Sequence, residues 1–201
     1  MSEAQHVIRC RCGHLRGALP ANQCLVRLRC YCRDCQAYAH ALGAAGVILD
    51  TLGGTQVVVT LQQYLRFTEG TDKLGCLSLS RKGLLRWYAS CCDTPIGNTT
   101  RDPRVSFLGL VHTCLDGSPS TPGTAFDDDP LPVNVRHAKG RIRPQVTDTL
   151  VATARIAWHV LRARADGTWR KSPFFAAGTL APVVVPRILT EAEREKAYRD
   201  V

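Results

Sequence analysis

Seven of the ten cysteines in this chain fall into three short groups. A Cys-x-Cys pair comes first, a Cys-x-Cys-x-x-Cys group follows, and two adjacent cysteines lie near the middle of the sequence. Thiolates this close together cannot all pair with one another as disulfides without strain, but they can converge on a soft metal ion. Because Zn²⁺ takes thiolate ligands in tetrahedral sites, the pattern predicts a chain folded around one or two zinc ions. The candidate ligands are Cys10, Cys12, Cys30, Cys32, Cys35, Cys91 and Cys92.

The start of the chain favours metal ligation over disulfides. No apolar segment precedes the first cysteines, so we expect no secretory signal and a cytoplasmic protein with reduced thiols. The longest apolar run, residues 41–49, contains two glycines and is too short to span a bilayer, so we expect no membrane segment. An even number of cysteines also fits a disulfide framework, which stays open as the alternative.

Residues 7–111 have the pattern of a mainly β protein. Apolar or alternating runs at 56–60, 74–80, 84–88 and 105–111 predict short strands separated by turn residues. The segment Ser80-Arg81-Lys82-Gly83 between two of these runs predicts a hairpin turn. Strands at this spacing favour antiparallel sheets over alternating strands and helices.

The pattern changes towards the C-terminus. Glycine, proline and aspartate dominate residues 116–145, which predicts a long surface loop that would cover a site or merely extend into solvent. One long helix is expected over 146–165 and a short one from Thr190, where Thr190 and Glu193 form a capping box. In the long helix, an apolar stripe is expected to pack against the core, and it consists of Leu150, Ala154, Ala157, Trp158 and Leu161.

These patterns define the expected organisation of the chain. Residues 1–115 would form a cysteine-rich zinc-binding β domain, residues 116–145 the loop, and residues 146–201 a helical extension packed on the same domain. A hydrophobic content of 45% with 21% charged residues is typical of a globular protein with a real core.

The net charge of +9 constrains the partners. Nine lysines and arginines lie between Arg136 and Lys171, against two aspartates. A basic face can attract nucleic acid, a small anion or another protein, and it can equally be a solvated helix face. Aromatic residues make up only 6% of the chain and no base-reading motif is present, so we do not expect nucleic acid to be the partner.

The local sequence around the cysteines must bend for them to share an ion. Side chains two residues apart on a regular strand point to opposite faces, so Cys10 and Cys12 require a turn, which Gly13 permits. The three thiolates of Cys30, Cys32 and Cys35 likewise require a tight knuckle. Three thiolates and one Zn²⁺ carry a net charge of −1, which Arg33 and nearby backbone N–H groups could offset.

Three segments together resemble the family of glutathione-dependent formaldehyde-activating enzymes and centromere protein V. They are Cys10-Arg11-Cys12-Gly13, Cys30-Tyr31-Cys32-Arg33-Asp34-Cys35 and Cys92-Asp93-Thr94-Pro95-Ile96, which correspond to the family patterns CxCG, CxCxxC and CxxCGTPL. The resemblance extends over roughly residues 7–111. It implies an Mss4-like β fold, a closed four-thiolate zinc site at Cys10, Cys12 and the Cys91–Cys92 region, and a three-thiolate zinc with an open position at Cys30, Cys32 and Cys35.

The chain departs from that family at the third segment. Ala89 stands where the family has the first cysteine of CxxC, and Asp93 replaces its glycine. Cys91 could replace the missing ligand through a bent backbone. Alternatively, the site has three thiolates with water or histidine, or it no longer binds metal.

Three function hypotheses follow. The resemblance implies a zinc-dependent carbon–sulfur lyase acting on adducts of glutathione or another small anionic thiol with an aldehyde; the spacing alone supports a zinc protein with an open site. The alternatives are a non-catalytic zinc module that binds protein or nucleic acid, and a metal-storing or redox-sensing protein. No catalytic side chain besides the open zinc can be named.

The remaining cysteines and histidines give weaker signals. Cys24, Cys76 and Cys114 stand alone, as is typical of small buried hydrophobic residues. His14 follows the first cysteine pair and is either a surface residue or a ligand-orienting one.

Overall fold

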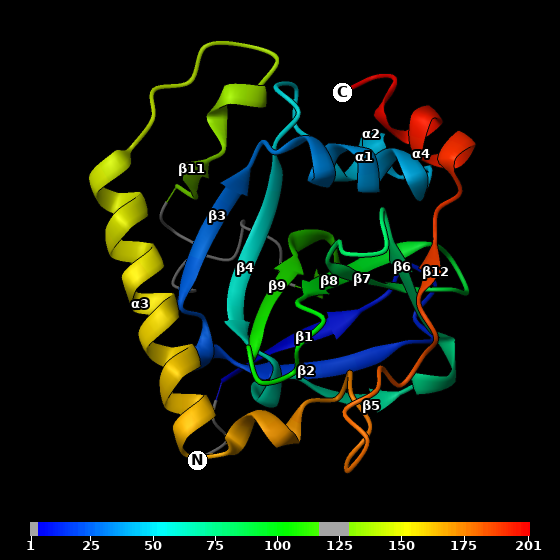
Figure 1. Ribbon diagram of the computed structural model, residues 1–201, viewed down its shortest axis with the longest axis vertical. Helices are drawn as coiled ribbons and strands as arrows, with labels where there is room; N and C mark the ends of the chain where they lie inside the picture. Colours follow the sequence, from blue (N-terminus) through cyan, green and yellow to red (C-terminus); the bar gives the residue numbers. More distant parts are fainter. Residues whose placement is uncertain (1–3, 117–128) are drawn as a thin grey trace.

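Two β-sheets form the body of the molecule, so the mainly β fold predicted from the sequence is confirmed (Figure 1). The computed structural model describes residues 4–116 and 129–201. The smaller sheet is antiparallel and has the order β10-β1-β2-β5. Its strands are β10 (Leu115–Asp116), β1 (Gln5–Arg9), β2 (Arg16–Pro20) and β5 (Arg66–Glu69).

The larger sheet has eight strands in the order β11-β3-β4-β9-β8-β7-β6-β12. Its six inner strands pair antiparallel, whereas the edge strands β11 and β12 pair parallel to their neighbours. The strands are β11 (Leu131–Val133), β3 (Val26–Cys30), β4 (Thr55–Leu61), β9 (Phe107–Val111), β8 (Thr94–Thr99), β7 (Leu85–Ala89), β6 (Leu74–Ser78) and β12 (Arg187–Ile188).

The main core unites side chains of both sheets. Ile8, Leu19, Trp87 and Leu108 are fully buried there, and Phe174 from the C-terminal segment packs against the ring of Trp87 with 4.8 Å between the ring centroids. Strands β4 and β8 are buried along nearly their whole length. The three consecutive valines of β4 are typical of a strand covered on both faces, whereas β8 buries the polar residues Thr94, Asn98 and Thr99.

In the described parts of the chain, four α-helices lie beside the sheets: α1 (Arg33–Ala41), α2 (Ala45–Ile48), α3 (Val146–Ala165) and α4 (Glu191–Tyr198). Helix α4 packs on α1, and Ala37, Leu77 and Ala197 share a second small core there. Helix α3 runs along the edge of the larger sheet and contacts β4 and β11 (Figure 1). Within the described residues, no helix is long and apolar enough to cross a membrane.

The elements predicted from periodicity are present. Strands β4, β6, β7 and β9 occupy the four predicted runs, and Gly83 closes the predicted hairpin by donating to the carbonyl of Ser80. Helix α3 has the predicted bounds, and α4 begins after Thr190 with both hydrogen bonds of the capping box. Strands β1, β2, β3 and β8 and helix α1 were not predicted, because their runs are short and interrupted by cysteine, proline or charged residues.

The predicted inner face of α3 is wrong. Leu150, Trp158 and Leu161 are exposed over more than 60% of their surface, whereas the buried residues of the helix are Ala152 and Ala163. Alanines on the inner face let the helix lie close to Leu25 and Leu61 at the sheet edge. The apolar stripe therefore faces away from the sheets.

The loop expected over 116–145 is described only in part, because residues 117–128 lie outside the described residues. Its later part is ordered as strand β11 and a 3-10 turn at Val135–His137. Since β11 adds to the sheet beside β3, this part of the segment lies at the end of β3 that carries Cys30.

Candidate metal centres

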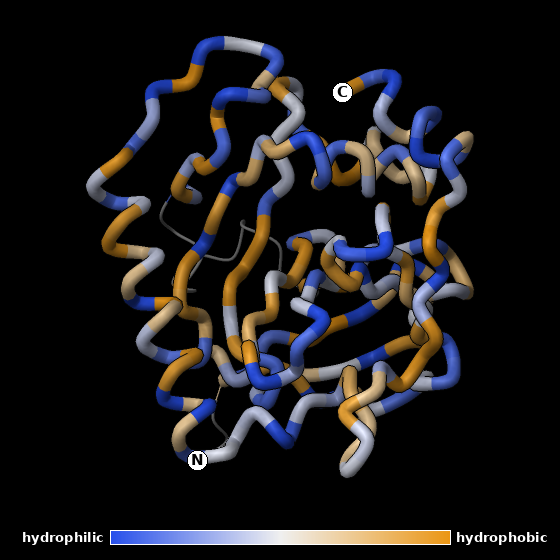
Figure 2. The backbone as a smooth tube through the Cα atoms, in the orientation of Figure 1, coloured by the Kyte–Doolittle hydropathy of each residue, from blue (hydrophilic) through white to orange (hydrophobic). Residues whose placement is uncertain are grey.

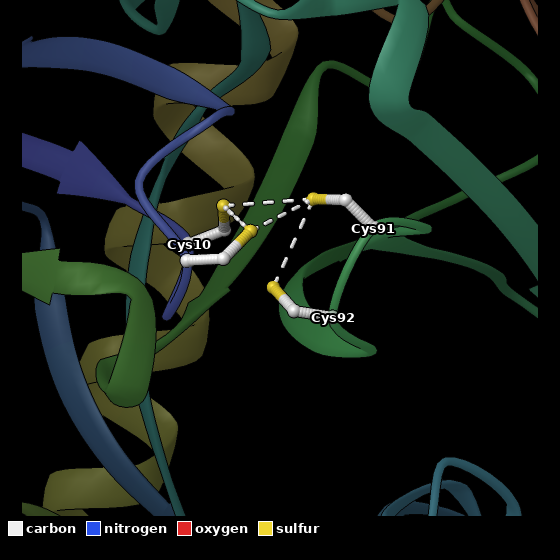
Figure 3. Close-up of side chains that lie close together, drawn as sticks. Cys10, Cys91 and Cys92 are labelled. Atoms are coloured by element: carbon white, nitrogen blue, oxygen red, sulfur yellow. Dashed lines mark hydrogen bonds between the residues drawn. The ribbon is translucent and has the colours of Figure 1, made fainter.

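Four cysteines from two distant turns meet at one end of the sheets. Cys10 and Cys12 belong to the turn between β1 and β2, and Cys91 and Cys92 to the turn between β7 and β8. Figure 3 shows the sulfurs of Cys10, Cys91 and Cys92 pointing toward one another. The first turn depends on Gly13, which has φ of +80° and donates its N–H to the carbonyl of Cys10.

The distances in this four-cysteine cluster suit a tetrahedral metal. The Sγ atom of Cys91 lies 3.8 Å from Cys10, 3.2 Å from Cys12 and 3.8 Å from Cys92, and Cys10 lies 3.5 Å from Cys12. Four sulfurs at about 2.3 Å from one zinc ion stand about 3.8 Å apart. All four sulfurs lie within 4.8 Å of one another, so the cluster could hold a metal ion.

Cys91 lies where the sequence left several ligands open, of which Cys91 was one. Ala89, in the position of the missing cysteine, is fully buried at the end of β7 and contributes to the core. The turn that follows bends enough for two adjacent cysteines to reach the cluster. Asp93 has φ of +53° in this turn, a left-handed conformation that explains why a glycine suits the position and that aspartate tolerates.

Polar groups surround the four sulfurs. The backbone N–H of Leu15 donates to Cys10 at 3.2 Å, and Nδ1 of His14 lies 3.1 Å from the sulfur of Cys12. Although burial raises the pKa of Cys92, hydrogen bonds from Thr94 and from Cys12 dominate and lower it to about 6. His14 is exposed and contacts the cluster through Cys12, so it can orient that side chain.

Three further cysteines meet where β3 passes into α1. Cys30 is the last residue of β3, Cys32 is the N-cap of α1, and Cys35 lies in its first turn. The sulfurs of Cys30 and Cys35 are 3.8 Å apart, and the three sulfurs lie within 4.8 Å of one another. The tight turn predicted for these three cysteines is therefore the junction between the end of β3 and the start of α1.

The start of α1 presents a backbone hydrogen-bond donor to the three-cysteine cluster. The backbone N–H of Cys35 donates to the sulfur of Cys32 at 3.3 Å, and the positive end of the α1 dipole lies at the cluster. Hydrogen bonds from Cys32 and Cys35 lower the pKa of Cys30 to about 2. The hydrogen bond between Cys30 and Cys32 raises the pKa of Cys32 to about 11. Of the three cysteines, Cys30 is therefore the one whose surroundings favour the thiolate form.

Two side chains that the sequence did not single out complete this cluster. Asn134, in the segment after β11, donates its amide to the sulfur of Cys30 at 3.3 Å. Arg86 is only 2% exposed, and its charge lowers the pKa of Cys35 slightly against the larger effects of hydrogen bonds and burial, which raise it. Neither residue lies near Cys30, Cys32 or Cys35 in sequence, so only the fold reveals them.

The described part of the predicted loop is held at this cluster. The amide of Gln36, fully buried in α1, donates to the carbonyls of Tyr31 and His137 at 2.9 Å each. Together with Asn134, this bond fastens the segment after β11 beside Cys30. No other described histidine, cysteine, aspartate or glutamate joins the three sulfurs.

Comparison with known proteins adds a family but no activity. The model of a family of unknown function, DUF6151, matches residues 1–184. The chain belongs to this family. No curated protein matches the sequence. A crystal structure of a Rhodobacter sphaeroides protein is similar at 15% identity over 58% of this chain and 91% of that one, with a TM-score of 0.38. The matching family model is not that of the formaldehyde-activating enzymes, so that resemblance stays a proposal.

A cavity of about 450 Å³ borders the four-cysteine cluster of this DUF6151 member. Its lining includes Arg11, Val47, Ile48 and Cys92. The guanidinium of Arg11 donates to the backbone carbonyl of Cys92 at 3.1 Å, which places a cation at the edge of the cavity. Arg9 and Asp93 also line the cavity, so charges of both signs border it.

The three lone cysteines take no part in either cluster. Cys76 and Cys114 are buried in the core, as expected, and burial raises the pKa of each to about 12. Cys24 is half-buried, and burial raises its pKa to about 11. These thiols stay protonated near neutral pH, which suits packing and not reactivity.

Proposed function

We propose that the protein binds zinc at both clusters, with a closed structural site at Cys10, Cys12, Cys91 and Cys92 and an open site at Cys30, Cys32 and Cys35. Two observations support the choice of metal. Both donor sets consist of sulfur alone, and the distances between sulfurs match a tetrahedron of Zn–S bonds. The first site joins two turns that lie about eighty residues apart in sequence and that each carry two of its cysteines. A metal that links distant parts of the chain in this way is typical of a structural site.

The open site carries the functional proposal. The single observation behind it is that three sulfurs converge at a helix start and no further ligand-type side chain joins them among the described residues. A zinc ion with three protein ligands supplies a Lewis acid with one position for a substrate atom. Asn134 and the N–H groups of α1 would orient and partly neutralise the thiolates, and Gln36 would keep the covering segment in place.

The motif resemblance suggests the reaction. A thiol such as glutathione adds to an aldehyde: its sulfur bonds to the carbonyl carbon, and its proton passes to the carbonyl oxygen. The reverse reaction breaks the same carbon–sulfur bond, which makes the enzyme type a carbon–sulfur lyase. The net charge of +9 favours an anionic thiol.

A second function is a non-catalytic zinc module that binds another molecule. The cavity of about 450 Å³ favours it, because that cavity borders the closed cluster and not the open one. The two functions differ in what happens at Cys30, Cys32 and Cys35, so variants of that cluster distinguish them.

The test combines metal analysis with turnover. We expect two zinc ions per chain, and Cys32→Ser or Cys35→Ser should remove one of them. The same variants should abolish the exchange between glutathione, formaldehyde and their adduct, followed by exchange NMR, while Cys24→Ser should retain it. A wild-type exchange rate equal to the uncatalysed one would refute this substrate. Loss of zinc without any change in exchange would leave the binding module as the function.

A further inference from the structure

Helix α3 has two apolar faces, and only one of them is covered. The inner face carries Ala152 and Ala163 and packs on the larger sheet. The outer face carries five of the large hydrophobic side chains that are exposed in the described residues, each at 62–65% exposure. They are Val146, Leu150, Val151, Trp158 and Leu161. Figure 2 shows hydrophobic residues recurring along this helix at the border of the molecule.

The central residues of the outer face form a straight stripe. At 100° per residue, Leu150, Ala154, Ala157 and Leu161 fall within about 60° of one another around the helix. The helix has 20 residues and is about 30 Å long, and the stripe from Leu150 to Leu161 extends over about 16 Å of it. A contiguous apolar surface of this kind is typical of an interaction site.

We infer that this stripe joins two copies of the chain through an antiparallel pair of α3 helices. The spacing of the stripe is symmetric about its midpoint, between Ala154 and Ala157. A two-fold axis at that point therefore brings each residue opposite an equivalent one, as a self-complementary interface requires. The opposed pairs are Leu150 with Leu161 and Ala154 with Ala157.

The side chains suit this register. The two alanines at the centre let the helices approach closely, and the leucines on both sides of them fill the space between the axes. Trp158 and Val151 lie on the same flank of the stripe and would pack against Val151 and Trp158 of the partner subunit.

A groove extends the contact at one end of the helix. It has a volume of about 430 Å³, and its lining includes Val133, Val146 and Leu150. In the antiparallel register, Leu161 of the partner subunit stands opposite Leu150 and can enter this groove. One helix pair with such a groove buries an area at the lower end of specific interfaces, so we expect a dissociation constant on the order of micromolar.

A bilayer surface is the competing partner. Arg155, Arg162 and Arg164 lie around the stripe, and a basic amphipathic helix with tryptophan can bind anionic lipid. However, a bilayer does not require leucines and alanines at symmetric positions, whereas a second copy of the chain does. The symmetry of the stripe therefore favours self-association.

The experiment uses the full-length, zinc-loaded chain under reducing conditions. Sedimentation and light scattering from about 1 to about 200 µM should show the mass rise from 22.0 kDa toward twice that value. Emission of Trp158 should shift to shorter wavelength over the same range, as its indole leaves water. Leu150→Glu and Leu161→Lys should each shift the dissociation constant at least tenfold, and Val185→Glu, at a site 89% exposed outside the helix, should not.

The register has its own test. The double variant Leu150→Glu with Leu161→Lys places opposite charges together twice in the antiparallel pair, so it should regain the dimer that each single change loses. A wild-type chain that stays monomeric over the whole range would overturn the inference. Binding of the monomer to phosphatidylserine vesicles through Leu150 and Leu161 would replace it with the bilayer, and failure of the double variant would overturn the antiparallel register. These outcomes do not depend on zinc content, so they are separate from the proposed function.

Discussion

At the residue scale, Cys91 is the side chain on which the four-cysteine cluster depends most. Its sulfur lies within 3.8 Å of the sulfurs of Cys10, Cys12 and Cys92, whereas Ala89 is buried and has no ligand atom. The cluster joins the β1–β2 turn to the β7–β8 turn, so a metal there would link both sheets.

We therefore predict that Cys91→Ser or Cys12→Ser lowers stability more than it lowers substrate affinity. The expected loss is on the order of 2–5 kcal/mol, similar to that of a covalent cross-link, which would lower Tm by roughly 5–15 °C. Thermal unfolding and zinc analysis of the same samples measure both effects, with Cys24→Ser as the control. Unchanged Tm and zinc content would exclude a structural role for the cluster.

His112 gives a prediction about pH. Burial lowers its pKa below 6.5, while its hydrogen bond to the carbonyl of Gln56 opposes this effect and the charges of Arg27 and Arg29 add to it. The unfolded chain therefore takes up a proton at a higher pH than the folded one. The stability contributed by neutral His112 is complete above pH 6.5 and is lost as the pH falls through the lower folded pKa.

Replacing His112 by Asn should flatten the fall of stability between about pH 7 and about pH 5. Denaturant unfolding of both proteins, at matched zinc content, measures the difference in their free energies of unfolding at each pH. Protonation of the cysteine thiolates affects both proteins equally, so it does not contribute to this difference. A parallel pH dependence of the two proteins would show that this histidine does not contribute.

At the scale of elements, the turn after β5 lies against the turn that holds the first cysteines. Gly70 has φ of +69°, and a Cβ atom there would stand 2.0 Å from the carbonyl oxygen of His14. Gly43 has nearly the same φ, +64°, but has no atom within 4 Å of such a Cβ. Alanine would be strained by the positive φ at both positions, but only at Gly70 would it also clash. Comparing the two substitutions therefore distinguishes the effect of the clash from that of backbone strain.

We predict that Gly70→Ala destabilises the protein by about 2 kcal/mol or more beyond the effect of Gly43→Ala. Because the clash displaces His14 and the neighbouring turn, Gly70→Ala should also weaken zinc retention at the four-cysteine cluster, as measured by competition with a chelator. Equal effects of the two substitutions on both measurements would contradict the contact between these turns.

At the scale of the whole molecule, the basic excess is spread over an exposed surface. Arg136, Arg155, Arg162 and Lys171 are all exposed, and they come from the segment before α3, from α3 itself and from the segment after it. Helix α3 contacts β4 and β11, and α4 contacts α1. That residues 146–201 extend the same domain stays a prediction.

We expect this charge to favour small anions and solubility and not sequence-selective DNA binding. Any binding to DNA should be non-specific and should weaken steeply with salt, because it would rest on phosphate contacts alone. Titration of labelled duplexes of different sequence at two salt concentrations measures this. Tight, sequence-selective binding at physiological salt would contradict the prediction.

The sequence by itself determined those features that depend on local spacing. Periodicity predicted α3, α4 and the strands β4, β6, β7 and β9, because neighbouring residues alone decide whether one face is apolar. The seven candidate ligands were likewise recognisable, since thiolates grouped in sequence have few alternatives to a shared ion. The short strands β1, β2 and β8 were missed, because their runs are short and interrupted by polar residues, glycine or proline, so that they show no clear alternation.

Only the tertiary structure decided how these parts are used. Cys91 joins Cys10 and Cys12 because β7 and β1 end at the same place, and Asn134 reaches Cys30 because β11 pairs with β3. The same applies to α3: two of its faces are apolar in sequence, and the alanine face is buried because small side chains fit the sheet edge more closely. Periodicity identifies an apolar face, but which face is covered depends on the shape of the surface that receives it.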